Sequence, residues 1–350
     1  MTQEETSDIQ NGLEYPFSIG PLPGEVIEIC DGVYWSRMPL GMDLKWINIW
    51  IIRDEGGWAI VDTGVNTSAT LEAWEKILTG FLGGEPITRV IGTHMHPDHI
   101  GMAGWLTEKF DIRLWMTRLE YVTCRMLVND PPLKPPKEGL DFYTKAGWGE
   151  EALENYKKRF GGFGKMVYPL PDAYKRIQDG DNLKIGDYVW QVVVGNGHSP
   201  EHACLLCEEL GLLISGDQIL PKISSNVSVF PTEPDANPLM DWITSCQSLI
   251  EKVPANVLVL PSHNKPFYGA HTRLSALIAK HEKTLQRLLD LVTREPVIAV
   301  ECFGALFKRT IGGGSISLAT GETIAHLNYL WHDGRIKRKL EGQVYKYSIE

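Results

Sequence analysis

The pattern of apolar and polar positions predicts that the first part of the chain alternates between sheet and helix. Residues 25–66 contain three runs rich in Val, Ile and Trp, and the Gly56–Gly57 pair before the third run is typical of a hairpin turn. In residues 68–82 the apolar side chains recur at helical spacing instead. A strand over 89–93 then leads to a helix over 101–110. This alternation favours an α/β layered architecture.

Residues 118–178 interrupt this alternation. They contain a proline-rich break at 130–139 and an aromatic stretch with helical character at 148–164, which together predict a largely helical insertion. Strand patterns then return, separated by one more helix: strands over 182–196, 203–209, 210–220 and 256–263, and a helix over 239–252.

The pattern changes again after residue 268. It predicts three helices and a final hairpin: 271–292, 297–308, 321–334 and 335–350, the last turned at Glu341–Gly342. Three helices and a hairpin within about 80 residues are the outline of a winged-helix module. We therefore expect a large domain over 1–267, with the helical insertion at about 118–178, and a small C-terminal domain over 268–350.

Composition and charge narrow the class of protein. Of the 350 residues, 43% are apolar and 22% charged, which is typical of a soluble globular protein. The net charge of −10 argues against nucleic-acid binding over the whole surface, although residues 268–350 carry 12 basic and only 8 acidic side chains. The first 17 residues have no signal-peptide pattern, and the apolar runs are too short to cross a membrane.

The six cysteines form no dense disulfide pattern, which favours reduced thiols and a cytoplasmic protein. Cys204 and Cys207 have the spacing of a metal-binding CxxC. They lie in a predicted strand, however, where residues three apart point to opposite faces. The sequence has no second CxxC. Two ordinary strand cysteines are therefore the better interpretation.

The segment THMHPDHIG at 93–101 carries the first candidate chemistry. His94 and His96 are two apart in extended chain, so their side chains can point to the same side. The proline that follows suits the first turn of a helix, and Asp98 and His99 at that turn then project differently. Four nitrogen and oxygen ligands at this spacing indicate a metal site. The alternative is a run of surface histidines with a helix-capping aspartate.

Further candidate ligands each come soon after a predicted strand: His198 in GHSPEH, Asp217 in SGD and His263 in PSH. A single loop histidine is more often without a function, but here the same placement occurs three times. Together with the first four residues they make seven ligands. That number is enough for two metal ions that share one carboxylate.

HMHPDH resembles the HxHxDH motif of the metallo-β-lactamase superfamily, in the dinuclear branch typified by hydroxyacylglutathione hydrolases. VDTG at 61–64, GHSPEH, SGD and PSH are similar to the other family motifs and occur in the family's order, over about residues 25–267. The resemblance implies an αββα sandwich with the metals between two sheets. It also implies that one metal is bound by His94, His96 and His198, the other by Asp98, His99 and His263, and both by Asp217.

The resemblance also implies an activity. We expect hydrolysis of a small carbonyl ester by a hydroxide that bridges the metals, the substrate being a thioester of acyl-CoA or acylglutathione type, or a lactone. Asp98, a ligand with a free oxygen, is the candidate to accept and return the proton. With no cysteine among the ligands, zinc is the default metal, and iron or manganese would also accept this set. Asp62 is either a buried aspartate that orients ligand residues or a plain turn residue.

The C-terminal stretch TGETIAHLNYLWHDGRI resembles the winged-helix tail of the β-lactamase-like-protein-2 group, whose activity is of nuclease type. With the basic run RIKRK at 335–339, it gives the alternative function, a metal-dependent endoribonuclease. Against it, winged helices often serve in dimerisation or packing, so the tail could equally mediate a homodimer.

The insertion supplies candidates for a substrate pocket. Five aromatic side chains could line it: Tyr121, Tyr143, Trp148, Tyr156 and Phe160. Packing within the insertion is the alternative for most of them. Lys157, Lys158 and Arg159 could bind a phosphate or carboxylate tail of a small-molecule substrate, and a solvated helix face is the alternative for these three.

Overall fold

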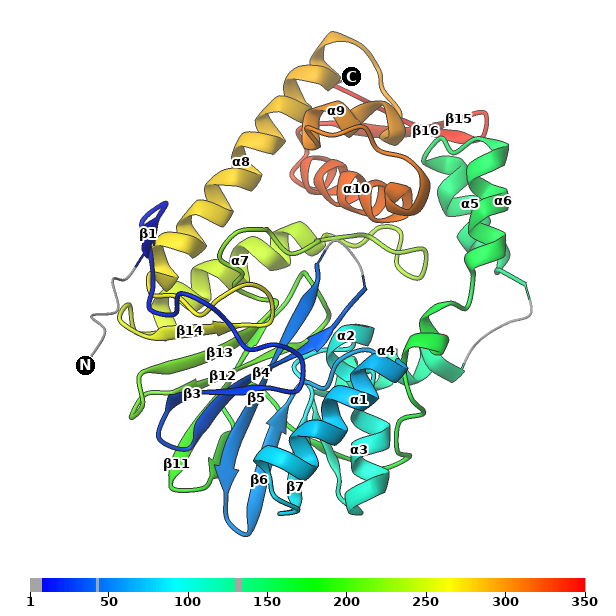
Figure 1. Cartoon of the computed structure of the whole chain (residues 1–350). Helices are drawn as coiled ribbons and strands as arrows, with labels where there is room; N and C mark the ends of the chain where they lie inside the picture. The colour runs from blue at the N-terminus through cyan, green and yellow to red at the C-terminus, as the bar shows by residue number, and fades with distance from the viewer. Residues whose placement is uncertain (1–7, 42–43, 130–133, 350) are drawn as a thin grey trace.

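The structure is a computed structural model that describes residues 8–41, 44–129 and 134–349. Two sheets lie face to face with helices outside them (Figure 1). The larger sheet has seven strands in chain order: β3 (Val26–Cys30), β4 (Val33–Pro39), β5 (Trp46–Asp54), β6 (Gly57–Val61), β7 (Ile87–Ile91), β8 (Leu114–Met116) and β9 (Tyr174–Arg176). The smaller has five: β10 (Asn182–Ile185), β11 (Tyr188–Gly195), β12 (His202–Cys207), β13 (Leu212–Gly216) and β14 (Leu258–Pro261).

Helices cover the outer face of each sheet. On the larger sheet lie α1 (Ser68–Lys76), which continues as the π-helix η1 (Ile77–Phe81), and α3 (Ala103–Phe110); on the smaller lie α7 (Pro238–Lys252) and α8 (Ala270–Arg294). A short hairpin of β1 (Asp8–Gln10) and β2 (Leu13–Tyr15) precedes them. The predicted αββα sandwich is confirmed. In the described residues no helix is long and apolar enough to span a membrane.

The central strands are apolar on both faces because each sheet is covered on both sides. In β5, Trp50 lies in the core between the sheets, whereas its neighbour Ile51 packs toward the helices. Cys204 and Cys207 of β12 divide in the same way: Cys204 lies in the core beneath α7 and α8, and Cys207 lies between the sheets. All six cysteines are free. The interpretation of this pair as ordinary strand residues is confirmed.

Strand direction sets where the functional segments emerge. β6, β7, β8 and β9 are parallel neighbours, and so are β13 and β14. β11 runs in the direction of β13, because both are antiparallel to β12 between them. The segments after β7, β11, β13 and β14 all carry candidate ligands. The two sheets are joined close to these segments by Asn48 of β5, whose backbone N–H donates to Ser262 O at 2.7 Å.

The described residues of the segment 118–178 are partly helical. It contains α4 (Arg118–Asn129), α5 (Lys137–Lys145), α6 (Glu150–Arg159) and the short 3-10 helix η2 (Phe163–Met166). Part of the predicted proline-rich break, at 130–133, lies outside the described residues. The last part of the segment is not helical, because β9 pairs with β8 in the larger sheet.

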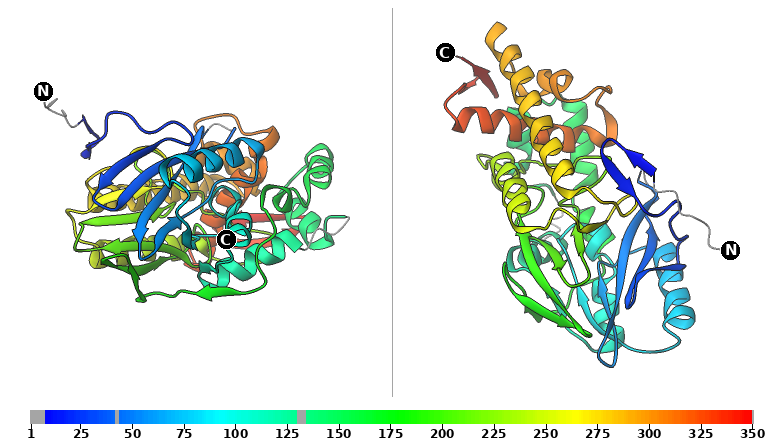
Figure 2. Two further views of the ribbon diagram at one scale, coloured as in Figure 1. Left: turned by 60° about the horizontal axis from the view of Figure 1, so that its bottom comes forward. Right: turned by 90° about the vertical axis from the view of Figure 1, so that its left-hand side faces the viewer.

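The C-terminal part continues from α8 into short helical segments, one longer helix and a hairpin (Figure 2). These are η3 (Ala299–Cys302), α9 (Phe303–Leu306), η4 (Gly313–Ser315), α10 (Ile316–His332), β15 (Lys337–Glu341) and β16 (Val344–Ser348). The predicted helix over 297–308 is thus two short ones, and α10 begins five residues before the predicted start. The hairpin turns at Gly342–Gln343, one residue later than predicted, because Glu341 pairs with Val344.

One hydrophobic core joins these C-terminal elements to the smaller sheet. It combines Leu206 of β12, Leu249 of α7, Leu274 of α8 and Leu327 of α10, none of them more than 1% exposed. The insertion reaches the same region, since Trp148 Nε1 donates to Thr320 Oγ1 at 2.9 Å. The domain division at residue 267 stays a prediction, and packing across it is continuous.

A continuous core predicts cooperative unfolding. Leu327→Ala, at a fully buried position of α10, should lower the free energy of unfolding by about 2–5 kcal/mol. Leu318→Ala is the matched control on the same helix, because Leu318 is 51% exposed, and should cost about 0.5 kcal/mol or less. Denaturant titration followed by tryptophan fluorescence and circular dichroism should give one shared transition. Two transitions, of which Leu327→Ala shifts only one, would contradict this account.

Two histidines form a buried pair in this core. His281 Nδ1 of α8 lies 3.1 Å from His326 Nε2 of α10, and His326 Nδ1 lies 2.8 Å from Glu322 O. A carbonyl oxygen only accepts, so His326 Nδ1 carries its proton and His326 Nε2 accepts from His281. The pKa of His281 is lowered to about 3, mainly by burial and further by the neighbouring His326 and Lys280. Burial lowers the pKa of His326 to about 4. Both rings are therefore neutral at pH 7.

This pair predicts a loss of stability in acid. The unfolded chain protonates His281 near pH 6.5, but the folded chain does so only near pH 3, so the free energy of unfolding falls as the pH drops below 6.5. The loss from His281 is about 2 kcal/mol at pH 5. His281→Gln keeps a donor for His326 and does not titrate. Denaturation of metal-free protein at pH 7.5 and 5 should show a smaller loss for this variant; equal losses would refute the argument.

Candidate metal centre

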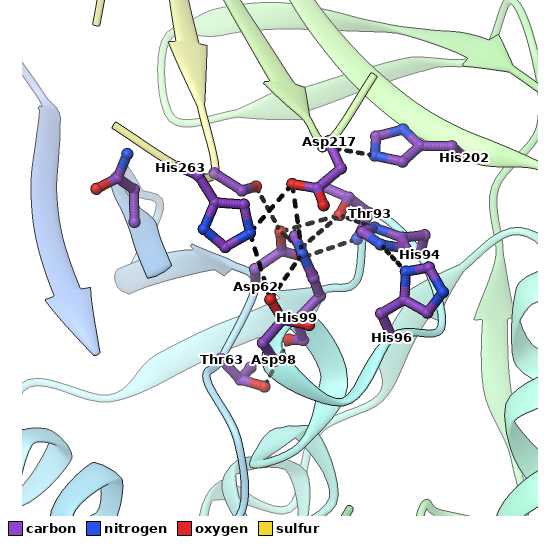
Figure 3. Close-up of polar contacts among 12 residues, drawn as sticks. Asp62, Thr63, Thr93, His94, His96, Asp98, His99, His202, Asp217 and His263 are labelled. Carbon is purple, nitrogen blue, oxygen red and sulfur yellow. Dashed lines mark hydrogen bonds and ion pairs between the residues drawn. The ribbon is translucent and has the colours of Figure 1, made fainter. Parts of the chain in front are cut away.

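The structure brings all seven predicted ligands together, from four segments that each follow a strand. Figure 3 labels all of them except His198. His94 and His96 follow β7, and Asp98 and His99 lie in the short helix α2 (Pro97–Ile100). The other three come after β11, β13 and β14: His198, Asp217 and His263. The proline is the first residue of α2 and ends the extended segment, as the sequence predicts. His94 and His96 then fall in one candidate metal-binding group, and Asp98 and His99 in another.

Three imidazole nitrogens form the first group. His94 Nε2 lies 2.8 Å from His96 Nδ1 and 3.3 Å from His198 Nε2, and the last two atoms are 3.1 Å apart. A tetrahedral ion with bonds of about 2.0–2.2 Å separates its ligand atoms by about 3.3–3.6 Å. The three atoms are therefore close to the spacing of three corners of such a site.

Asp98, His99 and His263 form the second group. Asp98 Oδ2 lies 3.6 Å from His99 Nε2 and 3.3 Å from His263 Nε2. The Asp98 side chain is 19% exposed, whereas those of His99 and His263 are almost fully buried. The second group is thus the one with a carboxylate that reaches solvent.

Asp217 lies between the two groups and presents one oxygen to each. Its Oδ2 is 3.5 Å from His198 Nε2 in the first group. Its Oδ1 is 3.6 Å from His99 Nε2 and 3.5 Å from His263 Nε2 in the second. A carboxylate in this position could serve two ions at once.

Hydrogen bonds on the outer side of the rings leave lone pairs on the inner side. His198 Nδ1 lies 2.7 Å from Asn226 O, and His263 Nδ1 lies 3.1 Å from Trp46 O. Carbonyls only accept, so both Nδ1 atoms carry protons and both Nε2 atoms face inward unprotonated when the rings are neutral.

Two atoms that face the space between the ligands show whether a cation fits there. In the part of the chain that the structure describes, His99 Nε2 and Asp217 Oδ1 are buried without a hydrogen-bond partner. Buried polar atoms are costly when nothing meets them, and metal-binding histidines characteristically bond outward through the other ring nitrogen. The donor set therefore fits divalent cations.

Asp62 orients His99. Its Oδ2 accepts from His99 Nδ1 at 2.7 Å, and its two oxygens accept from the N–H and the hydroxyl of Thr93 at 2.8 and 2.9 Å. Its backbone φ of +63° is rare for a residue other than glycine, and these buried hydrogen bonds offset the strain. Of the two interpretations of the sequence, these hydrogen bonds favour the one in which Asp62 orients a histidine.

Burial and charge have opposite effects across the centre. Burial lowers the pKa of His94 well below its usual value and that of His96 to about 3. Burial also acts to lower the pKa of His99, but nearby carboxylates, led by Asp98, outweigh it and raise the pKa well above its usual value. Burial acts to raise the pKa of Asp98, yet His99 and its neighbours lower it to about 2. A bound cation would take the place of the proton on His99 beside these carboxylates.

The comparisons with known proteins agree with this geometry. Residues 47–294 match the family described as "Metallo-beta-lactamase superfamily". The chain belongs to the metallo-beta-lactamase superfamily. Residues 285–349 match a second family, "Metallo-beta-lactamase-like, C-terminal domain", so the two matches meet inside α8.

Relatives within the superfamily cover most of the chain. A crystal structure of a beta-lactamase domain protein from Burkholderia ambifaria is 38% identical, covers 97% of this chain and 98% of its own, and has a TM-score of 0.90. The probable metallo-hydrolase YqjP of Bacillus subtilis is 21% identical over 87% of this chain and 94% of its own. The acyl-coenzyme A thioesterase MBLAC2 of Gallus gallus is 24% identical over 67% of this chain and 82% of its own. The chain is thus a metallo-hydrolase of this superfamily.

Sequence reasoning did not identify two residues that support the centre. His202 Nε2 accepts from the N–H of Asp217 at 3.0 Å. This approach needs Gly216, whose φ is +51° and where a Cβ would lie 2.4 Å from His202 Nε2. His202 is the second histidine of GHSPEH and so had a signal in the sequence.

Glu120 of α4 is the second residue that supports the centre, and no sequence motif indicated it. It is fully buried and accepts from Met95 N at 2.9 Å and Glu201 N at 2.8 Å. It therefore ties the segment after β7 to the segment after β11, and with them two sets of candidate ligands. Burial raises the pKa of this carboxyl.

The candidate pocket residues of the insertion mainly contact one another. Tyr143 stacks on Trp148 with ring centroids 4.0 Å apart, and Tyr156 packs edge-on against Tyr143 and Phe160. Tyr121 stacks on a tyrosine of β9. Lys157, Lys158 and Arg159 are exposed. These contacts favour insertion packing and a solvated helix face over a substrate pocket.

Glu120→Ala tests the support of the ligand segments. It leaves one buried and one partly buried N–H group without an acceptor, so we expect a loss of stability of about 1–3 kcal/mol. Metal affinity should fall about 10-fold, because both ligand segments lose their common anchor. Glu138→Ala, at an exposed glutamate in the first turn of α5, is the control. Chemical denaturation and competition with a chelator measure the two effects. A Glu120→Ala protein that matches the control in both would refute this role.

Proposed function

We propose that the chain is a dinuclear metallo-hydrolase that cleaves a small carbonyl ester, with a thioester of acyl-CoA or acylglutathione type, or a lactone, as substrate. The observation that carries this proposal is the position of Asp217. Its two oxygens face two separate ligand groups at 3.5–3.6 Å, which is the arrangement needed for one carboxylate to serve two ions.

In this proposal each group holds one divalent cation: His94, His96 and His198 the first, Asp98, His99 and His263 the second, with Asp217 on both. Bound cations would supply Lewis acidity toward the ester carbonyl and lower the pKa of water near neutrality. A donor set of imidazole and carboxylate without thiolate suits zinc first, and iron or manganese as alternatives.

Asp98 is the proposed proton carrier. Its Oδ2 is directed toward His263 Nε2 at 3.3 Å, and its side chain keeps 19% of its surface exposed. It can therefore accept the proton released by the attacking water on its other oxygen, Oδ1, and deliver it to the departing thiolate or alkoxide. The Thr93 hydroxyl donates to Asp62, and Asp62 accepts from His99 Nδ1. Together they hold the imidazole ring of His99 beside this carboxylate.

A thioester substrate is supported by the relative from Gallus gallus, which is named an acyl-coenzyme A thioesterase. The endoribonuclease alternative depends on the basic run 335–339. Arg338 in that run is engaged within the chain: it pairs with Asp235 at 2.7 Å and its guanidinium lies 3.8 Å from the ring centroid of Trp331. These two contacts weaken the case that the basic run 335–339 binds RNA.

We further propose that the C-terminal helices and hairpin form a winged-helix module that mediates a homodimer, in a cytoplasmic protein. The six free cysteines suit a reducing compartment. Sedimentation of the full chain, compared with a Leu340→Asp variant at the half-exposed leucine of β15, would test the dimer.

Asp217→Asn tests the central proposal. An amide cannot neutralise two cations, so we expect at most one tightly bound metal per chain and loss of turnover. Asp172→Asn, at a side chain that is 96% exposed, is the control. Metal content is measured by elemental analysis, and turnover by thiol release from acyl-CoA and acylglutathione and by lactone opening, beside an RNA-cleavage assay. Two metals and full turnover in Asp217→Asn would contradict the proposal; RNA cleavage without ester hydrolysis would favour the alternative.

A further inference from the structure

The segment 225–229, between β13 and α7, contacts two of the proposed metal ligands. The hydroxyl of Ser225 donates to the backbone carbonyl of Asp217. The backbone carbonyl of Asn226 accepts from His198 Nδ1 at 2.7 Å. This one segment therefore bonds to the residue between the two ligand groups and to a ring of the first group.

The same segment is held on its other side by α10. The side-chain amide of Asn226 donates to Glu322 Oε2 at 3.0 Å, and Val229 N donates to Gly321 O at 3.1 Å. The backbones come this close because residue 321 is glycine: a Cβ there would lie 2.8 Å from the Cβ of Ser228. The C-terminal helix is thus fitted against the segment.

A second C-terminal element contacts the chain beside the segment. Lys280 Nζ of α8 donates to Ser224 Oγ at 2.5 Å. Residues 224–229 are consequently bonded to two helices of the C-terminal part, although they lie within the predicted domain over 1–267. None of these three bonds involves a proposed metal ligand directly.

We propose that Glu322 is a positioning residue for the metal centre. Through Asn226 it holds the carbonyl that takes the Nδ1 proton of His198, and so it fixes the tautomer and the direction of the Nε2 lone pair. In this proposal a residue of α10 positions one histidine of the first ligand group. This inference rests on the ligand role proposed above for His198.

The test measures Zn²⁺ affinity of the purified full chain by competition with a chromophoric chelator. Glu322→Ala removes the acceptor for Asn226, and we expect the affinity of one of two zinc ions to fall about 10- to 100-fold. Glu322→Gln keeps an oxygen acceptor at this position and should restore most of that affinity. Asn328→Ala is the matched control on α10, because it removes bonds to Pro234 O and Ala236 O that do not reach His198. It should keep the parental affinity.

A double-mutant cycle separates positioning from a general loss of folding. Asn226→Ala alone should weaken zinc binding as Glu322→Ala does, and the double variant should be no weaker than the worse single variant, because the two residues act as one path. If Glu322→Ala does not fold, Asn226→Ala carries the same expectation. The thermal midpoint of each metal-free variant shows whether an affinity change comes with general destabilisation.

His198→Ala is the reference for these outcomes. If it weakens zinc binding while Glu322→Ala and Asn226→Ala both match Asn328→Ala, the positioning role is wrong and the proposed ligand set stands. Additive losses in the cycle would equally overturn the path through Asn226. If His198→Ala keeps the parental affinity, the proposed ligand set and this inference both fail.

Discussion

The structure depends on one electrostatic constraint: imidazole and carboxylate lone pairs from four segments face each other at the buried edge between two sheets. Asp217 stands between the two groups, and its Oδ1 and His99 Nε2 are buried without a hydrogen-bond partner in the described residues. Such an arrangement is unfavourable by itself, because buried polar atoms have lost water without gaining a hydrogen-bond partner. The proposed pair of cations would relieve this cost, and the surrounding scaffold holds the side chains in place.

The scaffold consists of bonds made on the far side of each ligand. Asp62 and backbone carbonyls take the outward protons of the histidines, and His202 holds the backbone of Asp217. Glu120 joins two of the ligand segments through their N–H groups. These partners come from strands, from the segments that follow strands and from the insertion. The centre therefore depends on more of the chain than its motifs.

The sequence predicted the parts of this arrangement that depend on local geometry. His94 to His99 lie in one short segment after a strand, so residue spacing alone indicated their convergence. Glu120 had no such signal, because its partner Glu201 is 81 positions away and the contact depends on how α4 is placed. The contact of Asn226 with Glu322 is likewise set by packing across the chain.

Two details of the fold also lay beyond the sequence pattern. β9 has three residues and is too short to show a period-2 pattern. The position of the C-terminal hairpin turn depends on the pairing of Glu341 with Val344, and the predicted turn was therefore one residue early.

The C-terminal part appears separate in sequence and continuous in packing. Its leucines share a core with the smaller sheet, and the two family matches overlap within α8 instead of meeting at a linker. Gly321 lets α10 approach the segment beside His198. This continuity explains how a short domain far along the chain could influence the chemistry of the edge between the sheets.

The most direct measurement is a crystal structure of metal-loaded protein with anomalous data collected at the absorption edge of the bound metal. The account predicts two peaks about 3.5–4 Å apart, one beside His94, His96 and His198, the other beside Asp98, His99 and His263, with Asp217 in contact with both. A single peak, or peaks away from Asp217, would contradict it.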